Sequence, residues 1–213
     1  MLLSKKIHIF DLDGTLLDSM PYWGKSILSL LDEQGFCYPP DILNILTPLG
    51  IREGTKYLNS IGLDADVDTV QAATEKAMTE FYRSTVIIKP YVKEYLKKLK
   101  DGGCRLFILT ASEPEFFTSC LKRNGIYDMF EKIWSCSYFS LPKSNPDIYF
   151  AAAKEINSKR SDIAFYDDNL GSLSGAMAAN IFTVGVYDEA SVADEDKIKR
   201  LTDKYIYSFS ELF

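Results

Sequence analysis

Two aspartates directly after a short apolar segment carry the clearest chemical signal in this sequence. Asp11 and Asp13 follow Ile7–Phe10, within the string FDLDGTLLDS. Residues i and i+2 of an extended chain lie on one face, so both carboxylates are expected to point together, and Gly14 lets the chain turn sharply after them. Like charges this close are unfavourable unless a cation or a shared proton compensates them. The pattern therefore indicates Mg²⁺, which prefers carboxylate and phosphate oxygens.

A second group of polar residues follows the apolar segment Arg105–Leu109. Thr110, Ala111 and Ser112 stand between this segment and an expected helix. A hydroxyl together with the N–H groups of a helix start can hold a phosphate. The alternative is that Ser112 is only the N-cap of the helix.

A lysine and two further aspartates complete the candidate set. Lys143 lies in the loop before an expected helix, where a solvated surface charge is the alternative. Asp167 and Asp168 follow the apolar segment Ile163–Tyr166. Adjacent acids can form a polar turn, but here they would also complete the carboxylate set that Mg²⁺ needs.

These residues need a sheet that brings the ends of separate segments together. Short apolar runs alternate with helical stretches, which is typical of a parallel sheet covered on both faces. We therefore expect an α/β core with a doubly wound, Rossmann-like parallel sheet, whose strands bind ligands at their carboxyl ends. The expected strands are Ile7–Phe10, Arg105–Leu109, Lys132–Ser135, Ile163–Tyr166, Phe182–Val186 and Tyr205–Ser208, and the expected helices are Val92–Lys100, Pro114–Asn124, Pro146–Ile156 and Leu173–Ala179.

Residues 18–89 interrupt this alternation with helical patterns only. A connection between two neighbouring parallel strands needs far fewer residues. We therefore predict an α/β core domain of residues 1–17 and 90–213 and an inserted all-helical cap domain of residues 18–89, with hinges near Leu17–Met20 and Ile88–Tyr91. The expected cap helices are Trp23–Gln34, Asp41–Leu46, Arg52–Ser60 and Thr69–Thr85.

The composition excludes several classes of protein. The net charge of the 213 residues is -6, which argues against a general nucleic-acid binder. The single histidine, His8, rules out multi-histidine metal sites, and the four cysteines form no C-x-x-C pair. No apolar run reaches the roughly 18 residues of a membrane span, and the first residues do not resemble a signal peptide. We expect a cytoplasmic monomer with no nucleic-acid or membrane partner.

The string FDLDGTLLDS resembles motif I of the haloacid dehalogenase superfamily of phosphotransferases. The resemblance implies that Asp11 is the nucleophile that forms an aspartyl-phosphate, and that Asp13 is the general acid and then the general base. Thr110 matches the end of motif II. The implied phosphate-binding residues are Gly14, Thr110, Ala111 and Ser112.

Two later strings resemble motifs III and IV of the same family. Lys143 opens the string KSNPDIY, with serine in place of the family's first proline, and would neutralise Asp11 and the transferring phosphoryl oxygens. The string DDNLGSLSGAMAAN makes Asp168 the main Mg²⁺ ligand and Asp167 a second ligand, direct or through water. The side chain of Asp11 and the backbone carbonyl of Asp13 would complete the metal site.

The position of the insert resembles the C1-cap members, nearest to the phosphoglycolate phosphatase and β-phosphoglucomutase-like branch. Such a cap excludes water and contacts the leaving group. Leu49–Glu53 resembles the specificity loop of these caps, in which Arg52 would hold a second anionic group. A surface pair of Arg52 with Glu53 is the alternative. Tyr22 and Trp23 stand where mutase and sugar-phosphatase relatives carry a histidine, and we expect them to pack within the cap.

The favoured function is a Mg²⁺-dependent phosphatase that acts on a small phosphorylated metabolite. The alternatives are a β-phosphoglucomutase-like phosphosugar mutase and a non-catalytic binding protein on the same scaffold. Glu113 stands where mutases commonly offer a lysine, which weakens the mutase alternative. The presence of every motif residue weakens the non-catalytic one. A haloacid dehalogenase is disfavoured because that chemistry needs neither Asp13 nor the metal carboxylates.

Overall fold

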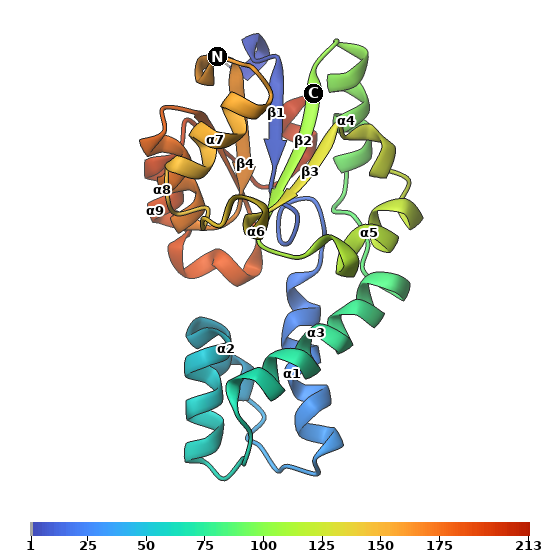
Figure 1. Cartoon of the computed structure of the whole chain (residues 1–213), viewed down its shortest axis with the longest axis vertical. Helices are drawn as coiled ribbons and strands as arrows, with labels where there is room; N and C mark the ends of the chain where they lie inside the picture. The colour runs from blue at the N-terminus through green and yellow to red at the C-terminus, as the bar shows by residue number, and fades with distance from the viewer. Residues whose placement is uncertain (1) are drawn as a thin grey trace. The chain divides into compact units, whose positions relative to one another are not determined.

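The chain forms two compact units, which we call the core unit and the helical unit. The computed structural model describes residues 2–213, apart from the side chains of Leu3, Asn44, Thr47 and Pro48 and the exposure of Gly50. The core unit consists of Met1–Asp18 and Ile87–Phe213, and the helical unit consists of Ser19–Val86 (Figure 1). Each unit is described by itself.

The described residues of the core unit form one six-stranded sheet in the order β3-β2-β1-β4-β5-β6, and all neighbouring strands are parallel. The predicted doubly wound parallel sheet is therefore confirmed. The chain runs from β1 to β2 and β3 on one side and then starts again with β4 on the other side of β1. This reversal opens the ligand-binding crevice of such sheets at the carboxyl ends of β1 and β4. The strands are β1 (Ile7–Phe10), β2 (Arg105–Thr110), β3 (Lys132–Ser135), β4 (Ile163–Asp167), β5 (Phe182–Val186) and β6 (Lys204–Ile206).

Alternate residues of the strands bury opposite faces of the sheet, as the strand period requires. Ile9, Phe107 and Phe165 belong to one buried cluster with residues of α7 (Asp147–Glu155), α8 (Leu170–Ala178) and α9 (Glu195–Leu201). On the other face, Phe10 and Tyr166 stack with ring centroids 4.3 Å apart. Tyr95 of α4 (Val92–Asp101) and Phe209 of the terminal 3-10 helix η5 (Phe209–Leu212) contact Tyr166 there.

Several predicted element boundaries in the core unit differ from the structure by one to three residues. Helix α8 begins at Leu170 instead of Leu173, because the Asn169 side chain accepts hydrogen bonds from the N–H groups of Gly171 and Ser172 and caps the helix early. Strand β6 ends at Ile206 because Ser208 forms a capping box with Glu211. Strands β2 and β4 each extend one residue further than predicted. The remaining helices of this unit are α5 (Pro114–Arg123) and α6 (Cys136–Phe139), with 3-10 helices η1 (Leu2–Ser4), η2 (Tyr127–Met129), η3 (Arg160–Asp162) and η4 (Glu189–Asp194).

The helical unit contains three described helices where the sequence predicts four. They are α1 (Met20–Glu33), α2 (Ile42–Ser60) and α3 (Val67–Ser84). The predicted break between Asp41–Leu46 and Arg52–Ser60 is wrong, because α2 runs through it. A proline and a glycine inside a helix are unfavourable, but Ile42, Leu46 and Leu58 are buried in one apolar cluster, and this packing offsets the cost.

Two short segments of the core unit join it to the helical unit along the chain, and they pair with each other. Leu17 forms an antiparallel bridge with Ile88, and the N–H of Lys89 donates to the Leu16 carbonyl over 2.9 Å.

In the part of the chain from residue 2 to residue 213, no helix is long and apolar enough to cross a membrane. The assignment of residues 18–89 as a cap stays a prediction.

Candidate active site

The crevice at the ends of β1 and β4 holds a buried cluster of carboxylates. Asp11 directly follows β1, and its N–H donates to the Tyr166 carbonyl over 2.8 Å, which continues the pairing with β4 beyond the strand. Asp167 is the last residue of β4 and Asp168 follows it. Among the described residues, these three aspartates form a group whose ligand atoms all lie within 4.8 Å of one another. This geometry agrees with the prediction that the ends of these strands lie close together.

A buried lysine lies between two of these carboxylates. The Lys143 Nζ contacts Asp11 Oδ1 and lies 2.7 Å from Asp167 Oδ2. Burial disfavours the charge of Lys143, but the two carboxylates outweigh it and hold the pKa of this ammonium well above its ordinary value. Lys143 is therefore not the solvated surface charge that its loop position also allowed.

Gly175 in α8 allows the Lys143 loop to come this close. A Cβ atom at position 175 would lie 2.3 Å from the Lys143 carbonyl oxygen, which is sterically forbidden. This requirement was missed in the sequence, where Gly175 stands in a helix rich in small residues. The close approach of α8 and the Lys143 loop therefore requires glycine at position 175.

The three carboxylates together can carry more negative charge than one lysine can neutralise. With all three ionised beside one ammonium, two negative charges remain in a buried space. Burial, together with the charges of Asp167 and Asp168, raises the pKa of Asp11 well above its ordinary value, and Lys143 opposes this shift. Burial and the charge of Asp167 likewise raise the pKa of Asp168 to about 7. A divalent cation with oxygen ligands would remove both excess charges, so this donor set fits Mg²⁺.

Asp168 is held by neutral groups. Thr15 Oγ1 donates to Asp168 Oδ1 over 3.1 Å, and Ser191 Oγ donates to Asp168 Oδ2 over 2.8 Å. Gly14 has a φ of 80° and comes so close that a Cβ there would lie 2.8 Å from the Asp168 carboxylate. Both its conformation and this approach require glycine at position 14.

Asp13 is half-buried and is oriented by the residues that follow β2. Ser112 Oγ donates to Asp13 Oδ2 over 2.7 Å, and the N–H of Ser112 donates to Thr110 Oγ1 over 3.1 Å. The alternative of a Ser112 helix cap is wrong, because α5 has Glu113 at its N-cap and the Ser112 hydroxyl is used by Asp13. Ala111 is exposed between Thr110 and Ser112.

Arg52 lies in the other unit, on an exposed part of α2. The segment Leu49–Glu53 is helical and not a loop. Glu53 forms its ion pair with Lys56, at 2.7 Å, and not with Arg52. Tyr22 packs against Phe81 with ring centroids 5.1 Å apart, which agrees with the expected packing role.

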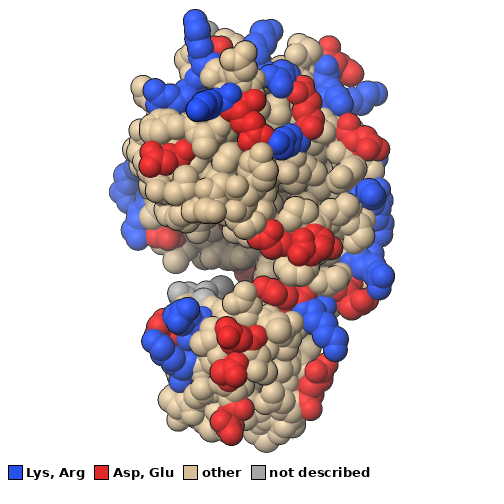
Figure 2. All heavy atoms as spheres, viewed as in Figure 1, with Lys and Arg blue, Asp and Glu red and all other residues tan. Residues whose placement is uncertain are grey.

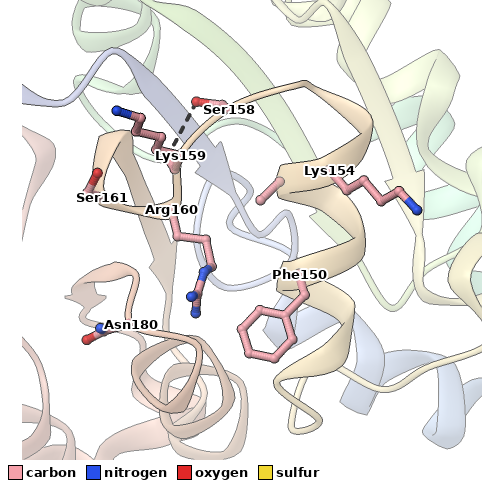
Figure 3. A pocket seen from close by; sticks show the side chains of 8 residues that line it. Phe150, Lys154, Ser158, Lys159, Arg160, Ser161 and Asn180 are labelled. Atoms are coloured by element: carbon pink, nitrogen blue, oxygen red, sulfur yellow. Dashed lines mark hydrogen bonds between the residues drawn. The ribbon is translucent and has the colours of Figure 1, made fainter.

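A surface pocket at the amino ends of β4 and β5 contains none of the predicted site residues. Lys154, Lys159 and Arg160 contribute to its lining, and basic side chains are numerous on this part of the surface (Figure 2). Their charges do not converge, because Lys154 and Lys159 point away from each other (Figure 3). The Arg160 guanidinium stacks on Phe150 and donates to the Ala179 carbonyl. This pocket therefore offers no alternative to the carboxylate cluster as the candidate site.

Comparison with known proteins agrees with this site. Residues 8–186 match the family described as haloacid dehalogenase-like hydrolase. A phosphoglycolate phosphatase of Colwellia psychrerythraea is 28% identical over 190 residues, which cover 85% of this chain and 84% of that protein. A validoxylamine A 7'-phosphate phosphatase of Streptomyces hygroscopicus subsp. limoneus is 23% identical and covers 93% of this chain and 95% of its own length.

A crystal structure of CbbY from Rhodobacter sphaeroides in complex with phosphate has the same fold. Its TM-score is 0.77 at 20% identity, over 98% of this chain and 96% of that chain. These comparisons confirm the prediction of a phosphoric monoester hydrolase on a Rossmann-like core. The family match spans most of the chain, including all four motifs. The chain therefore belongs to the haloacid dehalogenase-like hydrolases.

Proposed function

We propose that this protein is a Mg²⁺-dependent phosphatase that hydrolyses a small phosphorylated metabolite through an aspartyl-phosphate on Asp11. The observation that carries the proposal is the buried group of Asp11, Asp167 and Asp168 around one lysine. With all three carboxylates ionised, this group has two excess negative charges that a divalent cation would balance. The phosphatase names of the relatives support the same reaction class.

Asp11 and Asp13 share the covalent chemistry in this proposal. A carboxylate oxygen of Asp11 attacks phosphorus, the bond from phosphorus to the leaving oxygen breaks, and Asp13 donates a proton to that oxygen. Asp13 then takes a proton from water, the water oxygen attacks phosphorus, and the bond to Asp11 breaks to release phosphate. The Ser112 hydroxyl orients Asp13 for both proton transfers.

The other site residues stabilise charge and position the phosphoryl group. Lys143 favours the ionised form of Asp11 and neutralises phosphoryl oxygens. Gly14, Thr110, Ala111 and Ser112 are the proposed phosphate-binding residues. Asp11, Asp168, the backbone carbonyl of Asp13 and, directly or through water, Asp167 would hold Mg²⁺. When bound, the ion supplies the positive charge that lets an anionic phosphate approach these carboxylates.

A panel of phosphorylated metabolites tests the proposal. Purified protein is incubated with each compound in Mg²⁺, in EDTA, and in EDTA followed by excess Mg²⁺, and released phosphate is measured. We expect release from one or a few compounds, its loss in EDTA and its return with Mg²⁺. Unchanged release in EDTA would contradict the metal role, and no release from any compound by the folded protein would contradict the phosphatase.

A further inference from the structure

Asp168 differs from the other two carboxylates in the groups that hold it. Asp11 and Asp167 share the ammonium of Lys143, whereas Asp168 accepts one hydroxyl hydrogen bond on each oxygen, from Thr15 and from Ser191. An ammonium cancels part of the charge that a cation needs. A hydroxyl leaves the full charge in place and fixes only the orientation of the carboxylate.

The two hydroxyl groups also leave room for a metal ion. Each carboxylate oxygen has two lone pairs, so one hydrogen bond per oxygen leaves one lone pair on each for a cation. Partners behind a metal ligand that fix its orientation typically change metal affinity or activity by about 10- to 100-fold when removed. Thr15 stands four residues after Asp11 in the first motif, whereas Ser191 stands 23 residues after Asp168 and outside every motif.

Ser191 is itself held firmly on 3-10 helix η4. Its N–H donates to the Asp188 carbonyl over 3.1 Å, and the Asp188 side chain caps η4 by accepting from the N–H of Ala190 over 2.9 Å. Asp188 is buried and its Oδ2 lies 2.8 Å from Lys89 Nζ, which also donates to the Tyr187 carbonyl over 2.7 Å. An ion pair between half-buried Lys89 and buried Asp188 therefore anchors the turn that carries the Ser191 hydroxyl to Asp168.

We propose that Ser191 is a positioning residue for Asp168 and that its hydroxyl sets the affinity of the site for its divalent cation. This inference rests on the proposed metal site. It assigns a role in metal affinity to the segment after β5, and none of the sequence motifs includes this segment. Ser191 acts through its hydrogen bond to Asp168.

Direct titration with Mn²⁺ tests the inference without catalysis. Free Mn²⁺ is measured by electron paramagnetic resonance as metal is added to the wild-type protein and to each variant, and thermal unfolding in EDTA checks the fold. The decisive variants are Ser191→Ala and Ser191→Thr, with Asp168→Asn as the reference for a lost ligand. Ser174→Ala is the matched control, because Ser174 is also half-buried and its hydroxyl donates to the Leu170 carbonyl of its own helix.

We expect Ser191→Ala to raise the Kd for Mn²⁺ by about tenfold. Ser191→Thr, which keeps the hydroxyl, should restore most of the affinity, and Ser174→Ala should bind like the wild type. In the phosphatase assay, Ser191→Ala should raise the Mg²⁺ concentration for half-maximal rate while the rate at saturating Mg²⁺ stays close to that of the wild type.

The outcomes separate this inference from the proposed function. Wild-type affinity in Ser191→Ala, with binding lost in Asp168→Asn, would overturn the role of Ser191 and leave the metal site standing. Equal loss in Ser191→Ala and Ser191→Thr, with both variants folded, would overturn the hydrogen-bond explanation. Wild-type binding by Asp168→Asn would overturn the metal site itself, and the inference with it.

Discussion

The core unit and the helical unit carry their candidate functional residues in opposite ways. In the core unit, Asp11, Lys143 and Asp168 are buried, and each is held by groups from other segments of the chain. In the helical unit, Arg52 is exposed on a helix surface. A buried, interlocked site tolerates almost no change of residue type, whereas an exposed side chain is replaced at little cost to the fold. We therefore propose that the core unit carries the chemistry and that the helical unit contributes to substrate preference.

The largest expected effect is from Asp11→Asn in the core unit. The substitution keeps the shape of the side chain and removes the nucleophile, so the rate of phosphate release should fall by more than about 10⁴-fold. The fold should persist, because Lys143 keeps its ion pair with Asp167. Released phosphate and thermal unfolding are measured on the same preparation. Activity near that of the wild type would remove Asp11 from the nucleophile role.

Gly14→Ala probes how tightly the core site is packed. The added Cβ would lie 2.8 Å from the Asp168 carboxylate, and φ at this position is 80°. Displacement of a reacting group by about 1 Å can cost about 10²-fold in rate, and we expect a loss of that order. Steady-state kinetics at saturating Mg²⁺ measures it. A rate within threefold of the wild type would show that the site is looser than its contacts indicate.

His8 extends the contrast to stability, because this residue of β1 is buried against Tyr166 on one face of the sheet. Burial lowers the pKa of His8 from 6.5 to about 4. Between these values the unfolded chain binds a proton that the folded chain does not, so the contribution of His8 to stability falls as pH falls from 6.5 towards 4. The full change is about 3 kcal/mol.

Urea unfolding of the wild type and of His8→Phe, measured from pH 7 to pH 4, isolates this contribution from those of the carboxylates. As pH falls, the unfolding free energy of the wild type should decrease relative to that of His8→Phe. A constant difference would contradict the buried, neutral histidine. Because the chain has one histidine, its NMR signal reports the same pKa without ambiguity.

Arg52→Ala in the helical unit should have the smallest effect. A charge-assisted contact contributes about 1.5 to 3 kcal/mol, so we expect KM to rise about tenfold for substrates with a second anionic group, with kcat almost unchanged. Substrates with one phosphate group and no other anion are the control. Equal changes in KM for both kinds of substrate would remove Arg52 as a specificity residue. A fall in kcat as large as that of Gly14→Ala would break the contrast between the units.

The sequence predicted the site residues whose positions follow from the local pattern of apolar and polar residues. Asp11, Asp167 and Thr110 stand at the ends of apolar segments, and parallel strands place such ends at one edge of a sheet. Ser191 could not be predicted in this way, because its contact with Asp168 depends on how the turn after β5 folds back. The continuous α2 was also missed, because burial of its apolar face overrode the local preference for a break.

The most direct test of the central claim is to trap phosphorus on Asp11. Asp13→Asn is incubated in Mg²⁺ with p-nitrophenyl phosphate, whose leaving group needs no proton, then quenched in acid and analysed by intact mass and peptide mapping. Without the base that activates water, the phosphorylated protein should accumulate. We predict one added phosphoryl group, located on the peptide that contains Asp11 and absent in Asp11→Asn/Asp13→Asn. A phosphoryl group on another residue, or none while nitrophenol is released in a burst, would contradict the account.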